Sequence, residues 1–174
     1  MNDMTHDTAA RATSAGVGFL PQLAPVLPPM SGAYQRLVEA LWEQTHVPSE
    51  VLELCRLRLA QLHRSEADWQ RQERALAPRL REQLSRYTSS DAFDEGSRAC
   101  LAFAEVYAMD ASAISDAQAS AVQAHYGDAG LVLLIEALGL FDGLIRLNLL
   151  WGALPQAAVG ESGDPFARGC AREQ

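Results

Sequence analysis

Residues 130–151 read GLVLLIEALGLFDGLIRLNLLW, an almost unbroken apolar run whose length would allow it to cross a bilayer. Three charged residues, Glu136, Asp142 and Arg146, are spread along it, and each would be costly in lipid. We therefore interpret the run as a buried helix of a soluble bundle. Asp142 and Arg146 lie four residues apart and so share a face of this helix. Buried together they would form a structural ion pair, although they could instead clamp a substrate.

The chain before this run has apolar residues at helical spacing, and no stretch alternates polar and apolar residues as a strand does. Ser115 and Gln118 form a capping box that begins one helix, and Gly127 is a natural end for it. The predicted fold class is therefore all-α, a bundle of about six to seven helices. The other predicted helices cover 32–45, start at Pro48, run from Ser65 to before Pro78, run from Pro78 to Tyr87, and follow a cap at Ser89–Asp91.

One helical domain is predicted for residues 31–154, between two flexible ends. Residues 1–30 are interpreted as a tail and a proline-rich arm, because four prolines in FLPQLAPVLPPM forbid a helix there. Residues 155–174 are polar and contain glycine, and they are interpreted as a C-terminal tail. The arm could pack on a neighbouring subunit or lie loose; its apolar residues are Phe19, Leu20, Leu23, Val26 and Leu27.

The composition excludes several classes of partner. Lys and Arg total 14 against 22 Asp and Glu, a formal net charge of −8 that repels nucleic acid and anionic membranes. Apolar residues make up 48% of the chain, which is enough for a real core and excludes general disorder. Cys55, Cys100 and Cys170 include no CxxC pair, and the N-terminus has no secretory signal pattern. We expect a reducing, cytoplasmic location.

The stretch ELCRLRLAQLH at residues 53–63 resembles the helix that precedes the active site of AhpD-like proteins of the carboxymuconolactone decarboxylase superfamily. That family's motif is Glu, eleven residues, Cys, two residues, Cys, three residues, His. Laid on this chain it falls on Glu53, Ser65, Asp68 and Gln72, so that only the glutamate matches. RACLAFAEVYAMD at 98–110 resembles the family's LaFAe helix, and the following two helices also resemble theirs. The resemblance covers residues 32–152.

In redox members of that family, the cysteine pair at a helix N-terminus reduces peroxides with the help of the Glu and His. Ser65 and Asp68 cannot form a disulfide, and Gln72 cannot relay a proton near neutral pH. Thiol peroxidase activity, which the family name suggests, is therefore not expected. Ser65 and Asp68 are explained more simply as a helix cap, with Ser65 accepting from the third amide and Asp68 reaching back. The same amides could instead bind a substrate carboxylate, which the charge of Asp68 opposes.

Glu53 is the first candidate for acid–base catalysis, because burial on an apolar helix would raise its pKa. It could equally form an ion pair with Arg56 or Arg58. His63 could assist it, or could be an ordinary solvated histidine at a helix end. The remaining candidates line a pocket or bind substrate: Ser65, Asp68, Trp69, Gln72 and Arg146. No metal site is expected, because the four histidines are scattered and no His/Asp/Glu grouping repeats at ligand spacing. No cofactor is expected either.

Two functions follow from these residues. The first is a cofactor-free acid–base enzyme, a decarboxylase, isomerase or lactone enzyme, that acts on a small carboxylated molecule. The alternative is a non-catalytic relative that binds or scaffolds as an oligomer, since three of four motif positions are replaced. The resemblance implies a homo-oligomer, a trimer or a hexamer. A long apolar helix in a small domain agrees with self-association.

Overall fold

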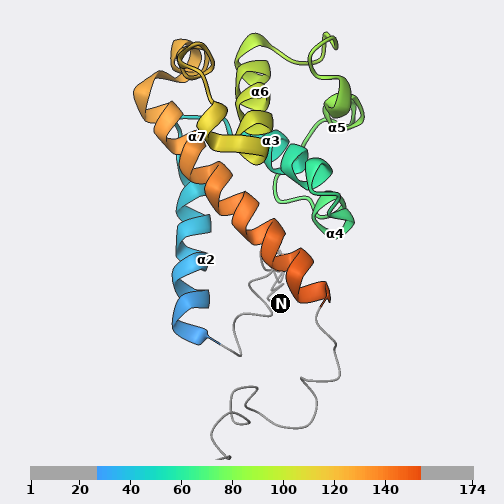
Figure 1. Cartoon of the computed structure of the whole chain (residues 1–174), viewed down its shortest axis with the longest axis vertical. Helices are drawn as coiled ribbons and strands as arrows, with labels where there is room; N and C mark the ends of the chain where they lie inside the picture. The colour runs from blue at the N-terminus through green and yellow to red at the C-terminus, as the bar shows by residue number, and fades with distance from the viewer. Residues whose placement is uncertain (1–26, 154–174) are drawn as a thin grey trace, which may run out of the picture.

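A computed structural model describes residues 27–153, and within this range the fold is all-helical and has no strand. The prediction of an all-α domain is confirmed. The predicted tail residues 1–26, with Phe19, Leu20, Leu23 and Val26, and residues 154–174, with Cys170, lie outside the described range. The elements are α2 (Pro28–Glu43), α3 (Ser49–Leu62), α4 (Glu66–Gln70), α5 (Pro78–Gln83) with a 3₁₀ turn (Leu84–Arg86), α6 (Glu95–Asp110) with a 3₁₀ turn (Ala111–Ala113), and α7 (Asp116–Ala153) (Figure 1).

Helix α2 begins four residues before the predicted Gly32, so that residues 28–30 of the predicted arm are helical. Pro28 and Pro29 occupy its first turn, where the missing N–H groups have no helical partner to lose. Proline is unfavourable in the interior of a helix but is accepted in its first turn, so Pro28 and Pro29 do not prevent α2 from starting within the predicted arm.

Helix α7 contains the predicted break at Gly127, whose φ of 67° lies in the left-handed region that glycine adopts easily. The capping box at its start is confirmed: the amide of Gln118 donates to Ser115 Oγ over 3.3 Å, and the amide of Ser115 donates to Gln118 Oε1 over 2.9 Å. No helix between residues 27 and 153 combines the length and hydropathy that a membrane crossing needs.

The cap of α6 differs from the prediction. Asp94, rather than Ser89–Asp91, precedes the helix and accepts the amide of Ser97 over 2.6 Å. Hydrogen bonds from Ser97 lower the pKa of Asp94. The segment at Ser89–Asp91 is held differently, because Arg98 donates to the carbonyl of Ser90.

Helix α3 is the centre of the core. Both α6 and α7 pack against it and against each other (Figure 1). Trp42 of α2 stacks on Phe141 of α7, with 5.4 Å between the ring centres. Helix α3 is therefore buried nearly all round, including two charged residues on it, Glu53 and Arg56.

Candidate functional site

Glu53 and Arg56 form a two-point ion pair inside the domain. Arg56 Nε donates to Glu53 Oε2 over 2.8 Å, and Arg56 Nη2 donates to Oε1 over 2.7 Å. The side chains are 0% and 2% exposed. Of the interpretations that the sequence left open for Glu53, the ion pair with Arg56 is the one found. Arg58 pairs instead with Glu105 of α6.

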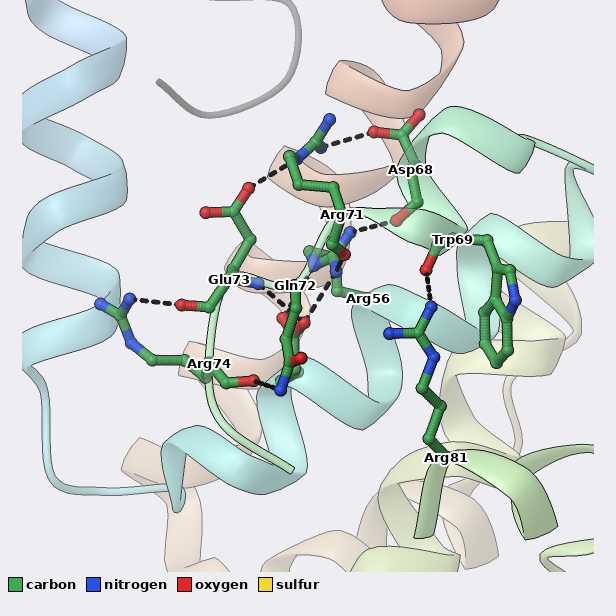
Figure 2. A network of polar contacts seen from close by, with 9 residues as sticks. Arg56, Asp68, Trp69, Arg71, Gln72, Glu73, Arg74 and Arg81 are labelled. Atoms are coloured by element: carbon green, nitrogen blue, oxygen red, sulfur yellow. Dashed lines mark hydrogen bonds and ion pairs between the residues drawn. The ribbon is translucent and has the colours of Figure 1, made fainter. Parts of the chain in front are cut away.

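The same ion pair holds the chain that follows α4. Arg56 donates to the carbonyls of Asp68 over 3.0 Å and Arg71 over 2.6 Å, and the amide of Glu73 donates to Glu53 Oε1 over 3.0 Å (Figure 2). These backbone groups would otherwise bond along a helix. The predicted helix from Ser65 to Pro78 therefore ends at Gln70.

Asp68 is a second buried carboxylate in this network. It is 0% exposed and accepts from Ser65 Oγ over 2.5 Å, Arg71 Nη2 over 2.5 Å and Asn148 Nδ2 over 2.9 Å. Ser65 precedes α4 as predicted, but its side chain caps no amide. The predicted capping box is wrong, because the hydroxyl donates to the carboxylate instead.

His63 and Arg146 meet at Asp142. His63 Nε2 lies 2.5 Å from Asp142 Oδ1, and Arg146 Nε donates to Asp142 Oδ2 over 2.6 Å. The prediction that Asp142 and Arg146 share a face is confirmed. The prediction of a buried pair is wrong, because Arg146 is 53% exposed. His63 is 15% exposed and linked to α7, so it is not a solvated histidine.

An open hollow of about 480 Å³ lies beside α4, and neither Glu53 nor His63 lines it. Two predicted pocket residues, Ser65 and Trp69, do line it. Gln72 does not line it; this residue is exposed and donates to the carbonyl of Arg74 (Figure 2). The candidate catalytic residues and the cavity are therefore separate. The lining residues are Arg58, Ala60, Gln61, Arg64, Ser65, Glu66, Trp69 and Ser85.

Arg64 is a lining residue that sequence reasoning missed. Its φ is 56°, in the left-handed region, and the amide of Ser65 donates back to the carbonyl of Ala60 over 2.9 Å. This hydrogen bond is typical of a helix C-terminus that ends in one left-handed residue, and that residue is usually glycine. Its guanidinium has no polar partner among residues 27–153. The missing glycine removed the signal by which the helix end could have been located.

Replacing Arg64 by Gly is expected to raise the free energy of unfolding by about 1 kcal/mol, because glycine adopts this backbone conformation without strain. Chemical denaturation of the two proteins measures the difference. The control is Arg64→Ala, which removes the same charge and keeps the strain, so it should leave stability nearly unchanged. An equal gain in both variants would mean that charge, and not backbone strain, is responsible.

The two described cysteines are buried thiols on α3 and α6. Burial raises the pKa of the Cys55 thiol well above its ordinary value, and burial raises that of Cys100 to about 12. Both are reduced. Within residues 27–153, no three His, Cys, Asp or Glu side chains gather in an arrangement that could hold a metal ion.

The sequence matches no protein-family model, and no curated protein matches it either.

Proposed function

We propose that this chain is a non-catalytic, self-associating relative of the AhpD and carboxymuconolactone decarboxylase proteins, whose motif positions hold the fold together. The observation that carries the proposal is the state of Glu53. It is 0% exposed, and its two oxygens accept three hydrogen bonds from Arg56 and the amide of Glu73. An acid–base catalyst must reach its substrate. A carboxylate held in this way supports a structural role.

The second carboxylate of the motif region supports the same conclusion. Asp68 is fully buried, and its two oxygens bind Ser65, Arg71 and Asn148. Together the two carboxylates join α3, α4, the 71–74 segment and the end of α7. We infer that replacement of the redox cysteines left a polar network with a new, stabilising role.

The absence of catalysis is tested by measuring whether the protein turns over a hydroperoxide or a lactone. We expect no reduction of cumene hydroperoxide by dithiothreitol above the uncatalysed rate, because burial raises the pKa of the Cys55 and Cys100 thiols and so leaves little thiolate near neutral pH. Carboxymuconolactone should likewise be left unchanged. A rate that disappears in Cys55→Ala or Cys100→Ala would contradict the proposal. So would a lactone activity that is lost in a folded Glu53→Gln variant.

Self-association is supported by large apolar side chains that the domain leaves exposed. Leu37 of α2 is 54% exposed, and Val132 and Leu150 of α7 are 60% and 66% exposed. Light scattering at micromolar concentration measures the number of subunits. A cytoplasmic, reducing location also belongs to this proposal, supported by the buried free thiols.

A second candidate function is the binding of a small carboxylated molecule in the hollow beside α4. The observation in its favour is Arg64, whose unpaired guanidinium lines the hollow together with Trp69. Benzoate should raise the melting temperature of the protein but not of Arg64→Gly, and uncharged benzamide should raise neither. Equal shifts in both proteins would reject this site.

A further inference from the structure

One face of α7 is left exposed by the domain between residues 132 and 150. Six positions lie along this face from residue 132 to residue 150, and the intervals between them are alternately four and three residues. Val132 and Leu150 at the two ends are 60% and 66% exposed, and Glu136, Gly139 and Arg146 are exposed as well. We call these positions the α7 seam: Val132, Glu136, Gly139, Gly143, Arg146 and Leu150. Helix α7 crosses the front of the molecule in Figure 1.

The chemistry of the α7 seam is symmetric about the level of Phe141. Gly139 and Gly143 lie two residues to either side of that level. Glu136 and Arg146 lie five residues away, with opposite charges, and Val132 and Leu150 lie nine residues away, both apolar. In two antiparallel helices, facing positions are those at mirrored distances from the centre. Each glycine would therefore face a glycine, each glutamate an arginine, and each valine a leucine.

Gly143 has no explanation within its own chain. A Cβ atom added there would meet nothing within 4 Å, whereas one at Gly139 would lie 3.1 Å from the hydroxyl of Tyr107. A glycine inside a helix costs about 1 kcal/mol relative to alanine. Because Gly143 has no side chain, the surface of α7 is low at this position, and a helix of a second molecule could approach it closely.

The charges of the α7 seam are also available to a second copy. Glu136 has no hydrogen bond or ion pair among residues 27–153. Arg146 binds Asp142 through Nε and is 53% exposed, so its two terminal nitrogens can reach another carboxylate.

We propose that a second copy of this chain occupies the α7 seam, with the two α7 helices antiparallel across a twofold axis at the level of Phe141. Glu136 of each copy pairs with Arg146 of the other, Val132 packs on Leu150, and the glycines allow close contact. A twofold interface uses the same patch on both subunits and requires an even number of them. The inference rests on the self-association proposed above. Of the trimer and the hexamer that the resemblance implies, it selects the hexamer, and a dimer would satisfy it as well.

The experiment is a charge swap followed by light scattering. Glu136→Arg and Arg146→Glu should each weaken the assembly on the order of tenfold or more and halve its mass at micromolar concentration, because like charges then face each other. The double variant should restore it. Gly143→Leu should also halve the mass while the melting temperature of the domain is kept or raised. The matched control is Glu43→Arg on α2, an exposed charge reversal away from the seam, which should change nothing.

The outcomes separate the two proposals. A monomeric wild-type protein would overturn both. An assembled protein whose mass none of the seam variants changes would overturn the pairing of α7 and leave self-association standing. Single reversals that dissociate the assembly, without rescue in the double variant, would overturn the antiparallel register.

Discussion

Replacing Arg56 by Ala is expected to lower the free energy of unfolding by about 3–5 kcal/mol, a large part of what a domain of this size has. The reason is that Glu53 would stay buried as an uncompensated charge, at 0% exposure. The carbonyls of Asp68 and Arg71 would also lose their donor. Urea denaturation followed by circular dichroism measures the change.

The matched control is Arg58→Ala on the same helix. Arg58 and its partner Glu105 are 18% and 25% exposed, so water can replace the lost contacts and we expect a loss of about 1 kcal/mol. The double variant Glu53→Leu, Arg56→Met removes both charges but still leaves three backbone groups unpaired, so it should recover only part of the loss. A loss below that of Arg58→Ala would contradict a structural role for the pair.

Signals that lie close together in the sequence predicted the fold well. The capping box at Ser115 and Gln118 and the break at Gly127 depend only on neighbouring residues, and both are found. The helix predicted from Ser65 failed for the opposite reason. Its end is set by Arg56 and Glu53, which take backbone groups twelve to twenty residues later in the chain. The helix propensities of residues 65–78 cannot predict that these backbone groups bond to Arg56 and Glu53 instead of continuing the helix.

The candidate site was predicted in part. The motif alignment selected four positions: Glu53, Ser65, Asp68 and Gln72. The first three are buried, with Glu53 and Asp68 joined through Arg56, whereas Gln72 is exposed. Their roles were not predictable, since burial and hydrogen-bond partners depend on packing between helices. The contact of His63 with Asp142 joins residues 79 positions apart in the sequence. A contact between such distant residues has no sequence pattern from which it could be predicted. Composition and spacing can select polar residues near a core, but packing decides whether they face a cavity.

Asp68→Ala is expected to lower the free energy of unfolding by about 3 kcal/mol, and to do so by loosening one junction rather than the whole core. Asp68 joins α4 to α7 by accepting from Ser65, Arg71 and Asn148. Without the Asp68 carboxylate, three donors lose their acceptor. Arg71 still keeps one hydrogen bond, from its Nε to Glu73 Oε1 over 2.6 Å. Amide hydrogen exchange should therefore speed up most in α4 and the 71–74 segment.

The control for that junction is Asn148→Ala, which removes a single neutral donor and leaves Asp68 bound to Ser65 and Arg71. We expect a loss of about 1 kcal/mol and little change in the exchange of α4. Equal losses in both variants would mean that contact with α7, and not the buried carboxylate, stabilises α4. The distinction bears on the proposed function, because the AhpD-like motif that residues 53–72 were compared with has a cysteine at this position. A cysteine at this position would not supply the charge that Arg71 and Asn148 bind, so Asp68→Cys should be as unstable as Asp68→Ala.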